Sequence, residues 1–136
     1  MNKAFVDTNV FLRILVRDDE HKSKSSAAFI ENSKANGLII YVLPVTVMEL
    51  VWVLEKLYKL ERGRVREMVE AILNTPQLEI ENEEVFRKAL ALYEKSNLKF
   101  ADALLGFWGM NAGCETVITF DRKHFEKIEG LKVIAP

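Results

Sequence analysis

Short apolar runs alternate with longer amphipathic segments along this chain. The apolar runs are continuous, which predicts strands that are buried on both faces. The run at residues 38–43 is rich in β-branched side chains and is closed by Pro44, as expected for a buried strand. The predicted strands cover residues 3–6, 38–43, 78–80, 116–120 and 131–134.

The segments between these runs carry start and stop signals for helices. Thr8 or Asn9 can cap a first helix that ends near Val16, because both side chains can accept from free backbone N–H groups. Gly37 and Gly113 are expected to end two further helices. The predicted helices run up to residue 16 and over residues 21–36, 46–58, 62–74, 83–95, 101–112 and 122–128.

This alternation of strands and helices predicts an α/β fold. Strands joined by helices form parallel sheets with right-handed crossovers, and helices then cover both faces of the sheet. We therefore expect a three-layer α/β/α sandwich with a central, mainly parallel sheet. In such sheets ligands bind beyond the carboxyl ends of the strands, so acidic residues at those ends are candidates for function.

Composition narrows the class of protein. With 136 residues, 49% hydrophobic and 29% charged, the chain is expected to form a single globular domain over residues 1–136. The longest uncharged apolar stretch, residues 38–48, is far shorter than the roughly 20 residues of a membrane helix, and no signal-peptide pattern is expected. The single Cys114 excludes an internal disulfide and suits a reducing cytoplasm.

Charge limits the ways in which the chain could bind nucleic acid. The formal net charge of −1 excludes a strongly basic coat protein, so any contact with nucleic acid must be local or carried by metal ions. Basic residues near the end of the third predicted helix are typical of a solvated surface, although they could attract phosphates or an acidic partner. They are Lys56, Lys59, Arg62, Arg64 and Arg66.

Four acidic residues are candidates for function, and each also has an ordinary structural explanation. Asp7 and Asp121 directly follow predicted strands, where either could be a turn residue or a helix cap. Glu49 could close a capping box with Thr46, yet it is the only charge between residues 38 and 54, and a carboxylate is costly there unless it is paired or binds a ligand. Asp102 lies in a first helical turn among apolar neighbours, where the helix dipole favours it.

Taken together, these four acids predict a metal site. Carboxylates that converge in a partly apolar cleft repel one another, and a divalent cation removes that conflict. Oxygen ligands without a suitable His or Cys favour Mg²⁺ or Mn²⁺ over zinc. Such ions can activate a water and stabilise charge on a phosphodiester.

Three segments give the chain a resemblance to PIN-domain nucleases, and more narrowly to VapC-type toxins of toxin–antitoxin pairs. They are FVDTNVFLRIL near the start, VTVMELVWVL in the middle and FADALLGFWGMNAGCETVITFDRKHF near the end. The resemblance implies an α/β/α sandwich with a Mg²⁺ or Mn²⁺ site. It makes Asp7 and Asp102 the firmest metal ligands, with Glu49 and Asp121 completing the site directly or through water.

The same resemblance implies a set of supporting residues and partners. Asn9 and Thr119 are expected to orient the acids. The family reading implies cleavage of single-stranded RNA, a homodimer and a small antitoxin partner. From their position in the sequence, Arg13, Arg122 and Lys123 are the candidates for contacts with the scissile phosphate.

The remaining features suggest no function on sequence grounds. His21 and His124 lie in polar, lysine-rich surroundings and are expected to be simply exposed. Trp52 is expected to lie in the core or a dimer interface. Gly106 and Gly109 interrupt a predicted helix at a cost of about 1 kcal/mol each, for which close packing is one explanation.

Several other interpretations stay open at this point. A phosphatase with a nucleophilic Asp after the first strand would need a second Asp where this chain has Asn9. A receiver-type signalling module would need an Asp after a middle strand, where Leu43 and Pro44 stand instead. The chain could also be an inactive PIN-like scaffold, or an RNA-processing nuclease outside a toxin–antitoxin pair.

Overall fold

A computed structural model describes residues 2–136 of the chain. The chain divides into two compact units, unit 1 (Met1–Glu81) and unit 2 (Asn82–Pro136). Each unit has its own parallel sheet and its own helices. Two of the four candidate acids, Asp7 and Glu49, belong to unit 1, and the other two, Asp102 and Asp121, belong to unit 2.

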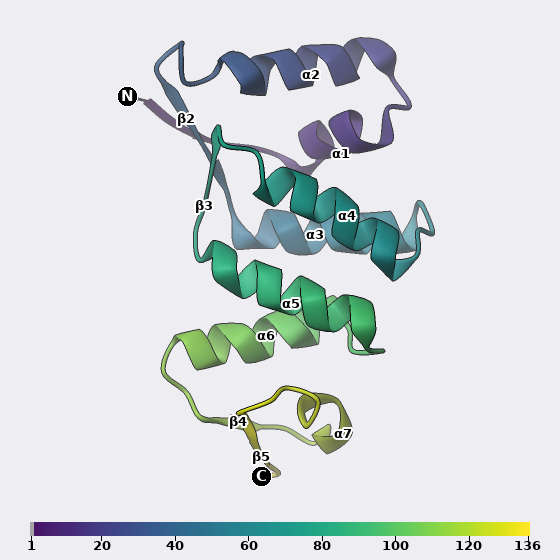
Figure 1. Ribbon diagram of the computed structural model, residues 1–136, viewed down its shortest axis with the longest axis vertical. Helices are drawn as coiled ribbons and strands as arrows, with labels where there is room; N and C mark the ends of the chain where they lie inside the picture. The colour runs from purple at the N-terminus through teal and green to yellow at the C-terminus, as the bar shows by residue number, and fades with distance from the viewer. Residues whose placement is uncertain (1) are drawn as a thin grey trace. The chain divides into compact units, whose positions relative to one another are not determined.

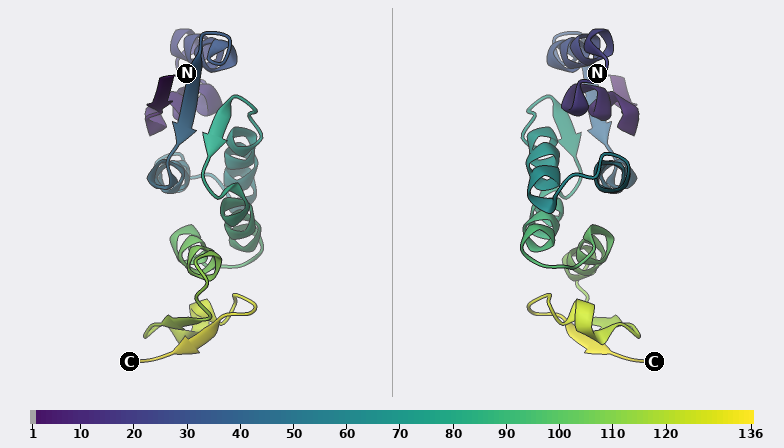
Figure 2. Two further views of the ribbon diagram at one scale, coloured as in Figure 1. Left: turned by 90° about the vertical axis from the view of Figure 1, so that its left-hand side faces the viewer. Right: turned by 90° about the vertical axis from the view of Figure 1, so that its right-hand side faces the viewer.

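Unit 1 contains a three-stranded parallel sheet in the order β1-β2-β3 (Figures 1 and 2). The register places Ala4 opposite Ile40 and Ile40 opposite Leu78. The successive elements of this unit are β1 (Asn2–Phe5), α1 (Thr8–Val16), α2 (Glu20–Asn32), β2 (Leu38–Val42), α3 (Pro44–Lys56), α4 (Arg62–Leu73) and β3 (Leu78–Ile80).

The core of unit 1 forms where its helices pack. α1 packs on α2 and on α3, and α3 packs on α4. Phe11 of α1, Leu54 of α3 and Val65 and Val69 of α4 have no exposed surface, and the last two lie four residues apart on one helix face. Burying such side chains stabilises the fold by about 1.5–3 kcal/mol each, so these contacts fix the helices that carry Asp7 and Glu49.

Unit 2 is built from a helix pair and a two-stranded parallel sheet. α5 and α6 lie side by side (Figure 1), and the rings of Tyr93 and Phe100 meet edge to face with centroids 5.9 Å apart. The elements of this unit are α5 (Glu83–Lys95), α6 (Phe100–Asn111), β4 (Thr116–Ile118), α7 (Arg122–Phe125) and β5 (Lys132–Ile134).

Close packing explains one of the two glycines in α6. A Cβ atom on Gly106 would lie 2.2 Å from Cδ1 of Ile128, a side chain that is only 2% exposed. A side chain at Gly106 would therefore force the buried Ile128 side chain to move. A Cβ atom on Gly109 would meet nothing within 4 Å among the described residues, and nothing in the structure explains that glycine.

The predicted α/β class with parallel strands is confirmed, whereas some element boundaries were wrong. The five strands form two sheets, one in each unit. α2 ends at Asn32, since residues 33–37 form turns before β2 and Gly37 adopts a φ of 74° directly ahead of that strand. α7 spans four residues only, shorter than the predicted 122–128. Within residues 2–136, no helix has the length and apolar character needed to cross a membrane.

Candidate functional site

Asp7 lies at the junction of β1 and α1, as the sequence predicted, but the cap of α1 differs from the prediction. Asp7 itself occupies the N-cap position, with extended backbone angles (φ −79°, ψ 146°). Thr8, one of the two predicted caps, is instead the first helical residue and is buried, since its side chain turns into the core. The Asp7 side chain accepts no hydrogen bond from the helix. The residue is also exposed, so its carboxylate is free to bind a ligand.

Asn9, which was expected to help orient the acids, is the second residue of α1 and is exposed. Its side chain makes no hydrogen bond within residues 2–136, so both its carbonyl oxygen and its NH₂ group face solvent. An orienting role for Asn9 stays a prediction.

Glu49 does not form the capping box that the sequence allowed. α3 begins at Pro44 with Leu43 as its N-cap, two residues before the predicted start, because proline is favoured in the first turn of a helix. Thr46 is thus inside the helix and buried, and it cannot pair with Glu49 as an N-cap. The Glu49 side chain is exposed, and no hydrogen bond or ion pair engages it among the described residues. A capping box therefore does not explain the presence of Glu49 in this apolar helix.

Asp102 is the third residue of α6 and lies in its first turn, as predicted. The side chain is half-buried, and its carboxylate has no ion pair in the described part of the chain. The free N–H groups and dipole of the helix N-terminus stabilise a negative charge there by roughly 0.3–1 kcal/mol. That stabilisation accounts for an acid beside the buried Phe100 and Ala103.

Asp121 is the one candidate acid whose carboxylate is held by neighbours. It is the N-cap of α7, and its Oδ1 accepts from the backbone N–H of His124 at 3.4 Å. Its Oδ2 meets Nδ1 of the His124 ring. This side-chain contact is the main cause that holds the pKa of the Asp121 carboxyl below its usual 3.8. Thr119 supports the same residue, because its Oγ1 accepts from the Asp121 backbone N–H at 2.9 Å.

The chemistry of these four side chains fits Mg²⁺ or Mn²⁺. All four supply carboxylate oxygen, the ligand that both ions prefer. Asp7, Glu49 and Asp102 are not committed to any hydrogen bond or ion pair within residues 2–136, so their oxygens keep their full capacity to bind a cation. Two acids belong to each unit, and the described residues contain no group of three His, Cys, Asp or Glu side chains that could hold a metal ion.

The three residues predicted to bind phosphate lie on the surface, and two of them form surface ion pairs. Arg13 pairs with Asp18 at 3.0 Å and Arg122 pairs with Glu126 at 3.6 Å. Exposed ion pairs of this kind contribute only about 0–1 kcal/mol, so both guanidinium groups can exchange their partner for a phosphate. Lys123 is exposed in α7.

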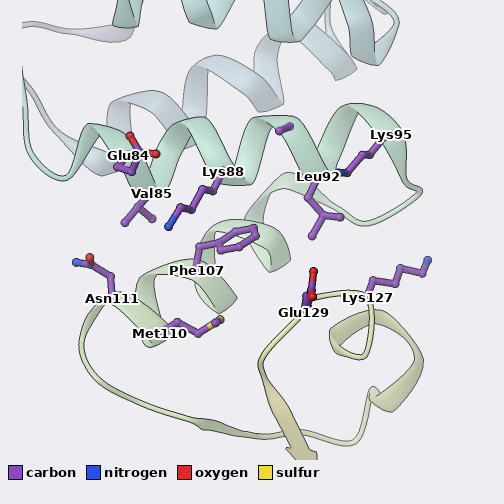
Figure 3. Close-up of a pocket in the computed structure, with 11 residues that line it drawn as sticks. Glu84, Val85, Lys88, Leu92, Lys95, Phe107, Met110, Asn111, Lys127 and Glu129 are labelled. Carbon is purple, nitrogen blue, oxygen red and sulfur yellow. The ribbon is translucent and has the colours of Figure 1, made fainter.

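Unit 2 also contains a cavity that the sequence did not indicate. It has a volume of about 800 Å³ and lies between α5, α6 and the chain after α7 (Figure 3). Lys88, Lys95 and Lys127 lie at its edge, while Phe107 and Met110 line its apolar side. None of the four candidate acids lines this cavity.

Sequence reasoning also missed the contact between His124 and Asp121. The signal was present, since a histidine three residues after an N-cap acid can reach its carboxylate. The lysine-rich surroundings of His124 favoured the simpler expectation of an exposed side chain without a partner.

Comparison with known proteins decides the family. The family model of the PIN domain matches residues 4–131 of this sequence, which is nearly the whole chain. The chain belongs to the PIN domain family. The resemblance inferred from the three sequence segments is thereby confirmed, and neither the phosphatase nor the receiver interpretation is retained.

A relative and a solved structure were found for this PIN domain. The chain is 34% identical to the VapC ribonuclease of Aquifex aeolicus (strain VF5) over 131 residues, which cover 96% of this chain and 95% of the relative. The crystal structure of VapBC2 from Rickettsia felis bound to a DNA fragment from their promoter aligns over 99% of this chain and 98% of that chain, with a TM-score of 0.39 and 16% identity. The family assignment rests on the family match and the sequence relative.

Proposed function

We propose that this PIN domain is a Mg²⁺- or Mn²⁺-dependent endoribonuclease that cleaves single-stranded RNA. The observation that carries the proposal is the state of Asp7, Glu49 and Asp102. The chain belongs to the PIN domain family. Asp7 is an N-cap, Asp102 lies in a first helical turn and Glu49 in a second, and none of the three is used for capping or pairing among the described residues. The similarity to a VapC ribonuclease supports the choice of RNA as substrate.

The proposed roles of the residues follow from their chemistry. Asp7 and Asp102 would bind the ion, and Glu49 and Asp121 would complete the site directly or through water. When bound, such an ion supplies the positive charge that activates a water and stabilises a phosphodiester under attack. Asn9 and Thr119 would orient the acids, and the bond from the Asp121 N–H to Thr119 supports the latter role. Arg13, Arg122 and Lys123 would hold the phosphate by charge.

We further propose that the chain is the toxin of a toxin–antitoxin pair and binds a small antitoxin protein. The support is the 34% identity to a protein named VapC over almost the full length of both chains. An RNA-processing role outside such a pair is the alternative, and it would share the same site.

A homodimer is part of the same proposal, and α3 provides a surface that could form it. Val45, Met48 and Trp52 follow the 3–4-residue spacing of one helix face and are 66%, 38% and 55% exposed. Apolar surface of this kind, contiguous on one helix, is typical of protein–protein contacts. Sedimentation of the chain and of its Trp52→Glu variant would test the assignment, since the variant should shift toward monomer.

Two more predictions belong to the proposal. We propose that residues 1–136 act as a single nuclease domain, which is supported by a family match that runs across the boundary between the two units. We also propose that the protein works in the cytoplasm, where its free Cys114 would stay reduced.

Replacement of Asp7 tests the proposed activity. Purified Asp7→Asn should cleave single-stranded RNA at least about 100-fold more slowly than the unaltered chain in Mg²⁺, because a lost ligand costs more than the 10–100-fold of a lost supporting residue. Its circular dichroism should be unchanged, since the carboxylate makes no hydrogen bond to the helix. Glu31→Gln, an acid on α2 outside the site, is the matched control and should cleave normally.

Two outcomes would contradict the proposal. An Asp7→Asn protein that cleaves RNA at the full rate would remove Asp7 from the mechanism. A chain that binds neither Mg²⁺ nor Mn²⁺ in calorimetry would favour the inactive PIN-like scaffold.

A further inference from the structure

His124 was expected to be an exposed residue without a role, but the structure brings it onto one of the candidate metal ligands. The two residues are three positions apart, at the N-cap and in the third position of α7. Their side chains are 48% and 38% exposed for Asp121 and His124, so the pair lies at the surface of unit 2 and is open to solvent. It thus differs from a histidine that is fixed by burial in the core.

Both carboxylate oxygens of Asp121 are engaged by this one residue. Oδ1 accepts from the His124 backbone N–H at 3.4 Å, and Oδ2 meets the Nδ1 atom of the His124 ring. A carboxylate held at both oxygens cannot rotate about its terminal bond without losing one of these contacts. Thr119 also holds the backbone of the same residue, because its Oγ1 accepts from the Asp121 N–H.

These contacts leave Asp121 able to bind a cation. An ionised carboxylate has about four lone-pair sites on its two oxygens, and His124 occupies two of them. The remaining sites point away from the two contacts, so their direction is set by His124. A group that orients a ligand through a hydrogen bond typically changes metal affinity by 10–100-fold.

We propose that His124 is a positioning residue, whose ring Nδ1–H donates to Asp121 and holds that carboxylate in the orientation that binds the divalent cation. The inference rests on the proposed function, because it assigns Asp121 to the metal site. The ring does not touch the ion or the RNA in this role. It acts through Asp121 alone.

Substitutions at position 124 separate the ring contact from the rest of the structure. His124→Ala removes the ring but keeps the backbone N–H, so the cap of α7 on Oδ1 is retained. His124→Asn places an amide NH₂ close to the position of Nδ1, and it can donate the same hydrogen bond. His21→Ala removes the other histidine, which is exposed on α2, and is the matched control.

Calorimetric titration of each full-length protein with MnCl₂ tests the inference without relying on cleavage. We expect His124→Ala to bind Mn²⁺ roughly 10-fold more weakly than the unaltered chain, and His124→Asn to bind within about threefold of it. His21→Ala should bind as the unaltered chain does. Circular dichroism of the four proteins should coincide, since the fold does not depend on the ring.

The outcomes distinguish a failure of this inference from a failure of the proposed function. If the unaltered chain binds Mn²⁺, Asp7→Asn does not, and His124→Ala binds normally, the role of His124 is overturned while the metal site stands. If His124→Asn is as weak as His124→Ala, a hydrogen bond from Nδ1 is not the cause and the inference also fails. If the unaltered chain does not bind Mn²⁺, the metal site and the role of His124 are both overturned.

Discussion

Asp7 in unit 1 and Asp121 in unit 2 occupy the same kind of position, yet their side chains are used differently. Each follows a strand and serves as the N-cap residue of the next helix. The Asp121 carboxylate caps its helix and meets His124, whereas the Asp7 carboxylate accepts no hydrogen bond from its helix. Position in the chain therefore does not decide whether such an acid is structural. The difference comes from the residues that follow each acid, because Asp121 has a histidine three positions later that its carboxylate contacts.

The largest expected effect separates the two acids in RNA cleavage. Asp7→Asn should lower the rate by at least about 100-fold and Asp121→Asn by about 10-fold, because Asp7 is proposed to bind the ion and Asp121 only to complete the site. Single-turnover cleavage of one RNA by both variants in Mg²⁺ measures the difference. Equal losses would show that the two acids bind the ion in the same way, and the contrast drawn from the structure would then have no consequence for catalysis.

The next effect separates them in stability. Asp121→Ala should lower Tm by about 3–5 °C because a helix loses its capping side chain, whereas Asp7→Ala should leave Tm within about 1 °C. Asp121→Asn should recover only part of the loss, since asparagine is an equally good cap but lacks the negative charge that meets His124. Thermal unfolding followed by circular dichroism measures all three variants. A large drop for Asp7→Ala would mean that its carboxylate does stabilise α1.

The sequence predicted the positions of these acids more reliably than their local roles. Continuous apolar runs located the five strands of residues 2–136, and α5 was correct at both ends because its apolar periodicity specifies it, although the Asn82 side chain forms no cap. The start of α3 was misplaced because Thr46 and Glu49 fit a capping box that Pro44 overrides. Local motifs compete in this way, and only the folded backbone shows which one is used.

The contact of His124 with Asp121 and the cavity beside α6 were not predictable in the same way. The cavity combines residues from α5, α6 and the segment after α7, whose packing no single stretch of sequence specifies. Gly106 is a similar case, since its need for a small side chain comes from Ile128, more than twenty positions further along the chain. Such long-range packing lies beyond periodicity, which reports on one element at a time.

A capping acid outside the candidate site shows whether the behaviour of Asp121 comes from capping alone. Asp19 caps α2 and accepts from the Lys22 backbone N–H at 3.0 Å, which lowers the pKa of its carboxyl below 3.8. A lowered pKa in the folded state stabilises the fold above the unfolded pKa of about 3.9, and this stabilisation is lost as the pH falls through the folded value.

Substitution of this acid gives the third prediction. Asp19→Asn should have a Tm about 2–3 °C lower than the unaltered chain at pH 7, and the gap should narrow as the pH falls below the unfolded pKa of about 3.9. Its RNA cleavage at pH 7 should be normal. Thermal unfolding between pH 3 and pH 7 measures the gap. A gap that is constant with pH would show that the charge of Asp19 is not what stabilises α2.

The smallest expected effect concerns the two glycines of α6 in unit 2, the unit that carries Asp121. Gly109→Ala meets open space and should stabilise the fold by about 0.5 kcal/mol, because alanine is the better helix former. Gly106→Ala gains the same propensity but must move the buried Ile128 side chain, so it should be neutral or destabilising. Urea unfolding of the two variants compares them directly. Equal stabilisation by both would mean that the Ile128 side chain moves aside freely, and close packing would then not explain why position 106 is a glycine.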